Sequence, residues 1–268
     1  MRPLLAGLLI ASSLVLAAGA SGATEANESS AMVSVSGGSF VPHYGDADDR
    51  VPVDAFRMDV HPVTNADFFR FVSRHPRWQR ERIATLFADE DYLSHWQGNL
   101  ALGTTAPYRS PVTNVSWFAA RAYCAAQDKR LPTLNEWEYA ARATEDAPVA
   151  SDLDAFSRRI LEWYGKPSRG PLPEVGSSFR NYWGLWDMHG LVWEWVRDFN
   201  SVMTTGASRK DAGGLDRTLF CAAGSIGTVD PNDYAAFMRY ALRGSSEARH
   251  AMRNLGFRCA RDEEGDAP

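Results

Sequence analysis

The stretch Pro111–Ala143, PVTNVSWFAARAYCAAQDKRLPTLNEWEYAARA, has the clearest helical pattern in the chain. Ser116 can cap an alanine-rich helix that ends near Gln127. Thr133 is followed three residues later by Glu136, which is the pattern of a capping box and predicts a second helix. The stretch therefore predicts two short helices joined by a tight turn. Their expected inward faces carry Trp117, Ala120, Tyr123 and Cys124 in the first helix, and Trp137, Ala140 and Ala141 in the second.

Upstream of this stretch, the sequence predicts strands and one more helix. Residues 32–45 alternate and then turn on Gly37-Gly38, which indicates a strand that enters a hairpin. Residues 51–60 alternate again, and Asn65 can cap a helix with an apolar face rich in phenylalanine. Residues 76–110 have no clear period, and we expect a long loop that packs through its aromatic side chains.

Downstream of it, residues 144–181 are rich in charge, proline and glycine, except for 153–164, LDAFSRRILEWY, which predicts a helix. No linker-like segment divides the chain after residue 32. Short elements and long loops together predict one mixed α+β domain with little regular secondary structure.

The composition limits the classes of function. Of 268 residues, 45% are hydrophobic and 23% are charged, which is typical of a globular protein. The net charge is −5 and there is no long basic run, so we expect no nucleic-acid partner.

The N-terminus has the pattern of an export signal. Arg2 precedes a short apolar run, and Ala18-Gly19-Ala20 fits a cleavage site. We expect a signal peptide at 1–23, a polar tether at 24–31, a folded domain at 32–262 and an acidic tail at 263–268. The mature protein would then be periplasmic or secreted and would have no membrane span. The alternative is an uncleaved anchor, although the run is shorter than the ~20 residues that a span needs.

Several motifs, taken in order and spacing, resemble the family of formylglycine-generating enzymes, also called sulfatase-modifying factors. They are GGSF, HPVTNADFFRFV, the stretch at 111–143, GLWDMHGLVWEW, Gly224-Ser225 and RNLGFRCARD. Within the family, the chain resembles two periplasmic branches, one associated with nitrite reductase and one with maturation of the siderophore pyoverdine. The resemblance implies a single compact domain of the C-type-lectin-like type.

The resemblance also implies a disulfide between Cys124 and Cys259. The chain has three cysteines, so one pair and one free thiol is the most that it can form. In the chain-entropy model, a disulfide that closes a loop of about 135 residues would stabilise the folded state by roughly 4–5 kcal/mol. The family's second disulfide is absent, because Ala141 and Tyr240 stand at its two positions. The alternative is that all three thiols stay reduced.

Active members of the family hold copper(I) with two thiolates, which suit a soft ion. Counted back from the RNLGFRCARD motif, these positions fall on Asp230 and Ala235, neither of which is a soft ligand. We therefore expect copper to be absent and formylglycine-generating activity to be lost. Cys221 could supply a single thiolate, so an oxidase that uses Cys221 is an alternative.

In the family, the tryptophan-rich segment wraps a calcium ion. The ligands map onto the side chains of Asp187 and Glu194 and the carbonyls of Gly190 and Val192. Hard oxygen donors are what calcium prefers, so the resemblance implies a structural calcium. The alternative needs no ion: Asp187 caps a helix and Glu194 pairs with Arg197.

Catalytic residues are not evident from the sequence. Asp230, Arg239, Arg243 and Cys221 are the candidates near the lost copper position. The arginines belong to a basic C-terminal run, which predicts either a groove for an anionic or peptide ligand or ion pairs with the many acids.

The function that follows from these features is an exported maturation or accessory factor for a redox enzyme such as nitrite reductase. Its partner would be an exported client protein or a peptide-like substrate. The alternatives are oxidative tailoring of a siderophore, formylglycine generation through Cys221, and a lectin-like binding module.

Overall fold

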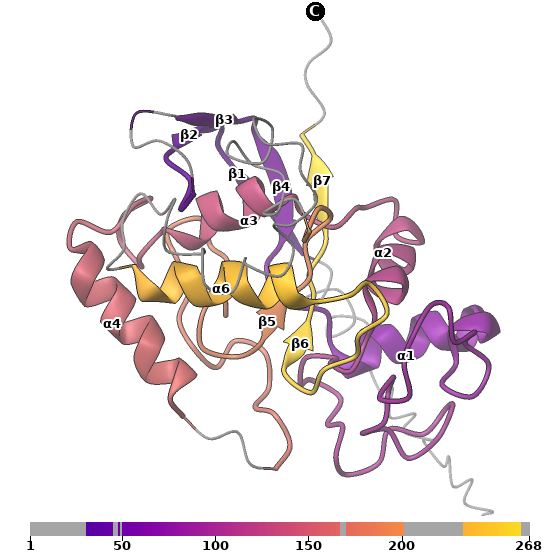
Figure 1. Ribbon diagram of the computed structural model, residues 1–268. Coiled ribbons are helices and arrows are strands. Elements are labelled where there is room, and N and C mark those ends of the chain that lie inside the picture. The colour runs from indigo at the N-terminus through magenta and orange to yellow at the C-terminus, as the bar shows by residue number, and fades with distance from the viewer. Residues whose placement is uncertain (1–30, 45–47, 49, 167–169, 201–232, 264–268) are drawn as a thin grey trace, which may run out of the picture.

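The computed structural model describes residues 31–44, 48, 50–166, 170–200 and 233–263. The expected signal peptide lies outside these residues, as do nearly all of the tether and the acidic tail. Four short strands come first, most of the helices follow, and three more short strands lie in the C-terminal part of the chain; long irregular segments connect these elements (Figure 1). This arrangement confirms a mixed domain with little regular secondary structure. In the described residues, no helix has the length and apolar character needed to cross a membrane.

The N-terminal half of the sheet structure is a bent ribbon of four strands. These are β1 (Met32–Val35), β2 (Gly38–Phe40), β3 (Val51–Val53) and β4 (Phe56–Asp59). β1 pairs antiparallel with β4, and β2 pairs antiparallel with β3.

The sequence predicts a hairpin turn at Gly37-Gly38, but the structure has no hairpin turn there. The strands on the two sides of these glycines pair with different partners. A Cβ on Gly37 would lie 2.9 Å from the backbone nitrogen of Ala55, so the glycine allows close approach of two backbones.

The C-terminal strands join the two ends of the domain. β7 (Ala260–Asp262) pairs with β4 and completes a three-stranded sheet in the order β1-β4-β7. β5 (Trp193–Glu194) and β6 (Leu255–Gly256) form a short parallel pair. This pair places the tryptophan-rich segment directly beside the RNLGFRCARD motif.

Helix α1 (Asn65–Arg74) begins one residue earlier than predicted, because Thr64 is its N-cap. The Thr64 hydroxyl accepts a hydrogen bond from the amide of Asp67, and the Asp67 carboxylate accepts one from the amide of Thr64. Asn65 has a different role: its side-chain oxygen accepts a hydrogen bond from the indole of Trp96 at 3.0 Å. The prediction of Asn65 as the cap was wrong because both residues are good caps and only packing decides between them.

The two helices predicted from 111–143 are present. α2 (Trp117–Ala125) is capped by Ser116, and α3 (Leu134–Ala141) has the capping box of Thr133 and Glu136. The helix predicted at 153–164 is also present as α4 (Leu153–Tyr164).

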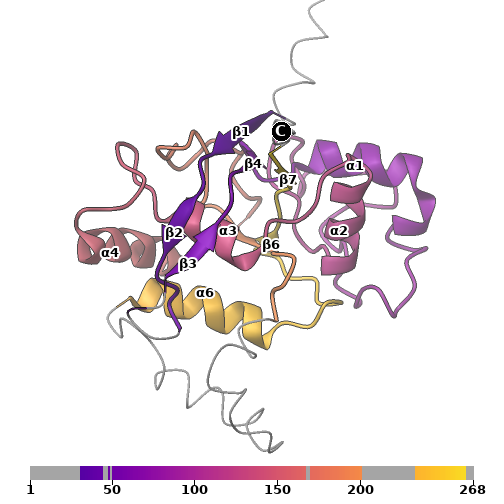
Figure 2. The ribbon, with the colours of Figure 1, turned by 90° about the horizontal axis from the view of Figure 1, so that it is seen from above.

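A further helix, α6 (Tyr234–Ser245), was not predicted; its arginines were noted only as part of a basic C-terminal run. α4 and α6 pack against each other, and α3 lies beside α6 in Figures 1 and 2.

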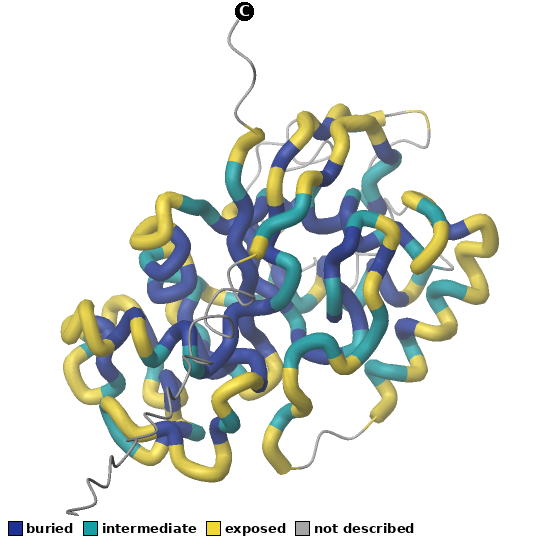
Figure 3. The backbone as a smooth tube through the Cα atoms, turned by 180° about the vertical axis from the view of Figure 1, so that it is seen from behind, coloured by how far each residue is buried: buried dark blue, intermediate teal, exposed yellow. Residues whose placement is uncertain are grey.

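The segment between α1 and α2 is irregular, as expected, apart from the 3₁₀ turn η1 (Pro76–Trp78). Trp78, Tyr92 and Trp96 are buried, and these side chains attach the segment to the body. Phe87 is the exception, because it is 38% exposed. In the domain as a whole, buried positions gather at the centre and exposed ones at the rim (Figure 3).

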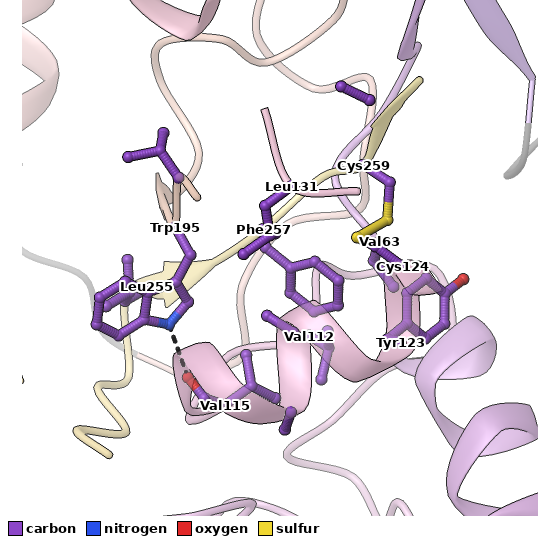
Figure 4. Packing of buried hydrophobic residues seen from close by; sticks show 14 of the residues in the cluster. Val63, Val112, Val115, Tyr123, Cys124, Leu131, Trp195, Leu255, Phe257 and Cys259 are labelled. Atoms are coloured by element: carbon purple, nitrogen blue, oxygen red, sulfur yellow. Dashed lines mark hydrogen bonds between the residues drawn. A yellow bond between two sulfur atoms is a disulfide. The ribbon is translucent and has the colours of Figure 1, made fainter. Parts of the chain in front are cut away.

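The core connects α2 with the C-terminal strands. Cys124 in α2 is bonded to Cys259, which confirms the expected disulfide (Figure 4). Beside it, the rings of Tyr123 and Phe257 lie 5.4 Å apart. The Trp195 indole donates a 2.9 Å hydrogen bond to the carbonyl of Val115. The disulfide therefore links segments that packing already holds together.

Candidate functional site

The second copper-ligand position of the family falls on Ala235, in the first turn of α6. The Asp233 carboxylate caps this helix through the amide of Ala236 at 2.9 Å. Ala235 has no exposed surface. The hydroxyl of Tyr164 donates to its carbonyl at 3.4 Å, and the Tyr164 ring lies 4.5 Å from that of Trp193. The position is therefore covered by an aromatic side chain of α4 and offers no donor for a soft metal.

The other residues predicted near copper, Asp230 and Cys221, lie outside the described residues.

The candidate arginines of α6 belong to a buried ion-pair cluster. Arg239 and Arg243 are one helical turn apart and both point to Glu138 of α3, with N–O distances of 2.8 and 2.5 Å. Burial raises the pKa of Glu138, but the two arginines outweigh this effect and bring its pKa down to about 2. The ion-pair interpretation of these arginines is therefore confirmed, and neither stands free as an acid–base group.

The cluster lies where the family's second disulfide would join the same two helices. Ala141 of α3 and Tyr240 of α6, which stand at its two positions, are both buried and line one cavity. A covalent link between α3 and α6 is thus replaced by a carboxylate with two guanidinium groups.

Glu194, a predicted calcium ligand, is the partner of Arg258. Both side chains are fully buried, and the guanidinium donates to both carboxylate oxygens at 2.8 Å. The indole of Trp137 donates to the same carboxylate at 2.7 Å. Arg258 also donates to the carbonyl of Trp186. The alternative pairing of Glu194 with Arg197 is therefore wrong.

Asp187, the other predicted acidic ligand, is held by the chain that precedes it. Its carboxylate accepts hydrogen bonds from the amide of Ser178 at 2.9 Å, from the Ser178 hydroxyl at 2.8 Å and from the amide of Gly176 at 2.5 Å. Burial raises its pKa, but the nearby His61, at 4.0 Å, and the hydrogen bonds from Gly176 and Ser178 lower the pKa overall. Asp187 therefore closes a loop and does not cap a helix.

The geometry does not fit the calcium site implied by the resemblance. Both carboxylates already accept several hydrogen bonds from protein groups, and an arginine neutralises Glu194. The described residues contain no group of three or more acidic, histidine or cysteine side chains that could hold a metal ion. Gly190 instead has a packing role, because its φ is +104° and a Cβ there would lie 2.8 Å from that of Ser178.

An open groove of about 1040 Å³ lies on another part of the surface. Its walls come from Asn65, Asp91 and residues within five segments: 94–97, 103–107, 110–114, 170–172 and 251–254. Burial, together with Arg253 and Arg80, lowers the pKa of His95 in this groove to about 4, so His95 is neutral at pH 7. Arg253 donates a 2.6 Å hydrogen bond to the carbonyl of Gly170.

The groove was not located from the sequence, because its lining residues are far apart in the chain, even though some of them, such as Asn114 and Asn254, belong to motifs of the family resemblance. The lining combines uncharged polar side chains, such as Ser94 and Thr104, with apolar ones, such as Leu172. Such a mixed lining suits an extended ligand that has both apolar surface and hydrogen-bonding groups.

Comparisons with known proteins show the family. A family model described as "Sulfatase-modifying factor enzyme 1-like domain" matches residues 17–263. The inactive C-alpha-formylglycine-generating enzyme 2 of Mus musculus is 32% identical over 275 residues, covering 86% of this chain and 85% of the relative. The formylglycine-generating enzyme of Streptomyces coelicolor is 31% identical, covering 81% of this chain and 83% of the relative.

Solved structures show the same fold. The structure of PvdO from Pseudomonas aeruginosa is similar with a TM-score of 0.50 at 18% identity, covering 88% of this chain and 96% of that chain. The matched family model and the relatives above 30% identity cover most of the chain. This protein therefore belongs to the family of proteins with a sulfatase-modifying factor enzyme 1-like domain.

Proposed function

We propose that this protein is an accessory or maturation factor that binds an exported redox enzyme, such as a nitrite reductase, and does not generate formylglycine. The observation that carries the proposal is Ala235, which is buried beneath Tyr164 at the position where the active family has a copper thiolate. Without a soft donor there, the copper chemistry of the family has no second ligand. The scaffold, by contrast, is intact.

The groove of about 1040 Å³ supplies the binding function. Its mixed apolar and uncharged polar lining suits an extended segment of a client protein, which presents side chains together with a regular series of amide and carbonyl groups. The groove shares no lining residue with the Glu138 cluster. A client can therefore bind without disturbing the ion pairs that hold α3 and α6 together.

The relatives support the proposal in two ways. One relative at 32% identity carries the name of an inactive formylglycine-generating enzyme, so the scaffold is found in a protein described as inactive. The likeness to PvdO extends to the fold alone. Export and a periplasmic location rest on the N-terminal pattern described above.

The first experiment tests the loss of activity. The purified protein is incubated with a CxPxR peptide, copper and a thiol reductant, and the peptide mass is measured. We expect no conversion of cysteine to formylglycine. Conversion that disappears on Cys221→Ala would show that an oxidase with a single thiol is present and would refute the proposal.

The second experiment tests the client. The protein is co-expressed with a periplasmic nitrite reductase, and the metal content and nitrite reduction of the purified reductase are measured. We expect maturation to fall when the exposed groove residues are filled, in Ser94→Trp and Thr104→Trp. Thr85→Trp, at an exposed position outside the groove, is the matched control. The proposed role in maturing this reductase would be refuted if the reductase matured equally well with the wild-type protein, with the groove variants and without any accessory protein.

A further inference from the structure

A second, smaller cavity lies beside the Glu138 cluster, between α4 and α6. Its volume is about 180 Å³. Residues 41–43, which follow β2, and the end of α3 close its remaining sides. None of its lining residues belongs to the groove described above. The lining that matters here consists of Arg142, Phe156, His189, Asp233, Arg239 and Tyr240.

The charges around this cavity do not balance. Three arginines, Arg142, Arg239 and Arg243, stand against two carboxylates, Glu138 and Asp233. Glu138 is shared by two of the guanidinium groups. The Asp233 carboxylate is occupied by the amide of Ala236 and by the Ser157 hydroxyl.

Arg142 is partly buried and has no carboxylate partner within the described part of the chain. Its guanidinium lies 5.7 Å from the centre of the Phe40 ring. Among the described residues, the cavity therefore has an excess of positive charge. Arg142 is only partly exposed, and partial loss of water makes an unpaired charge unfavourable, so the site favours a ligand with one negative charge.

Two buried polar atoms of the lining residues also lack partners among the described residues. Nη1 of Arg239 is a donor without an acceptor, and Nδ1 of His189 has no partner. Burial raises the pKa of the Tyr164 hydroxyl and the adjacent Arg239 opposes this effect, but no hydrogen bond of normal geometry joins Nη1 to that hydroxyl. Instead, it donates to the carbonyl of Ala235.

The state of His189 follows from its other nitrogen. Nε2 lies 2.9 Å from the carbonyl of Ala141, which can only accept, so Nε2 carries the proton. Nδ1 is then a lone-pair acceptor that needs a donor. Burial and the charge of Arg239 lower the pKa of His189 to about 3, so the ring is neutral and adds no second positive charge.

We propose that this cavity binds a small monovalent 2-hydroxy carboxylate, of the size of glycolate or lactate. The carboxylate accepts hydrogen bonds from Arg239 and Arg142 and balances the excess charge. The hydroxyl donates to Nδ1 of His189, which a simple carboxylate or chloride leaves unpaired. The rings of Phe156 and Tyr240 provide apolar surface for the short carbon chain.

The test uses the full mature protein and isothermal titration calorimetry. We expect glycolate and L-lactate to bind at least tenfold more tightly than acetate and propionate, which match them in size but lack the hydroxyl. We also expect chloride and malonate to bind weakly. Equal affinity for lactate and propionate would refute the role of His189. No binding of any acid by the folded protein would show that water fills the cavity and would refute the site.

Two variants separate the contacts. His189→Gln should reduce the preference for lactate over propionate to less than threefold. Arg142→Gln, on the partly exposed side, should weaken both acids at least fivefold and leave Glu138 paired. Arg158→Gln, an exposed arginine of α4 that does not line the cavity, is the matched control and should bind as wild type does.

If His189→Gln does not fold, Arg142→Gln still tests the proposal. Unchanged affinity of Arg142→Gln for both acids would contradict it. Thr104→Trp, which fills the groove, should leave lactate binding unchanged. That result would show that lactate binding in the cavity is independent of client binding in the groove.

Discussion

At the scale of single residues, the buried carboxylates decide the local architecture. Glu194 has no exposed surface, and it accepts hydrogen bonds from Arg258 and from the Trp137 indole. The three side chains come from β5, α3 and the strand region after β6. One acid therefore binds three separate segments to each other. Removing the Glu194 charge leaves Arg258 buried without a charged partner, and the free energy lost in this way exceeds what the ion pair itself contributes.

The first prediction concerns this residue. Glu194→Gln should lower the free energy of unfolding by about 3–5 kcal/mol, because the Arg258 charge remains buried. Urea denaturation followed by tryptophan fluorescence measures the change. Glu174→Gln is the matched control, since Glu174 pairs with Arg109 on the surface and should contribute within about 1 kcal/mol. A loss below 1 kcal/mol in Glu194→Gln would mean that the pair is not the link described here.

The second prediction concerns calcium at the same segment. Because Asp187 and Glu194 are satisfied by protein donors, the thermal midpoint should be the same in calcium and in chelator. Differential scanning calorimetry on protein dialysed against each buffer measures this. A midpoint that rises with calcium concentration, and that loses this dependence in Asp187→Asn, would restore the calcium site implied by the family resemblance.

At the scale of elements, α2, α4 and α6 are each attached by a different kind of link. The disulfide Cys124–Cys259 joins α2 to the C-terminal strands. Glu138 joins α3 to α6 through charge, and Tyr164 joins α4 to α6 through its ring and hydroxyl. A domain with such short strands depends on these links, because the ladders alone contribute few hydrogen bonds.

The third prediction concerns the disulfide. The double variant Cys124→Ala/Cys259→Ala should unfold with about 2–5 kcal/mol less free energy than the wild type, since the cross-link restricts the unfolded chain. Equilibrium urea unfolding measures this. Cys221→Ala, which removes the remaining thiol, is the control and should leave stability nearly unchanged.

A thiol count tests the pairing directly. Alkylation of the denatured, unreduced protein should label one cysteine, and peptide mapping should place the label on Cys221. Three labelled thiols would show that the bond does not form in this protein.

At the scale of the whole molecule, buried histidines make stability depend on pH. Burial lowers the pKa of His189 to about 3, and burial with Arg253 and Arg80 lowers that of His95 to about 4. In the unfolded chain both would titrate near their ordinary value of 6.5. On acidification the unfolded state therefore takes up protons first, and stability that is present above pH 6.5 is lost as the pH falls.

The fourth prediction is the size and origin of this loss. Between pH 6.5 and about 4, each histidine should add a slope of up to about 1.4 kcal/mol per pH unit to the free energy of unfolding. Urea unfolding at a series of pH values measures the slope. His95→Gln and His189→Gln should each flatten the curve. Acid stability equal to the wild type's in both variants would contradict the assignment of neutral, buried rings.

The sequence by itself determined the features that depend on near neighbours in the chain. The caps at Ser116 and Thr133 were predicted because a hydroxyl and the amide three residues on belong to one turn. Helix α4 was predicted from its own apolar spacing. The pairing of Cys124 with Cys259 was implied by the family motifs and not by distance along the chain.

Only the tertiary structure decided what each charged group does. Glu138 meets Arg239 across 101 residues, and Glu194 meets Arg258 across 64. The sequence offered many possible partners for these charges, and only the packing of α3 against α6, and of β5 beside β6, selected them. The groove and the cavity could not be predicted from the sequence for the same reason. Their walls come from segments that lie side by side only after the chain has folded.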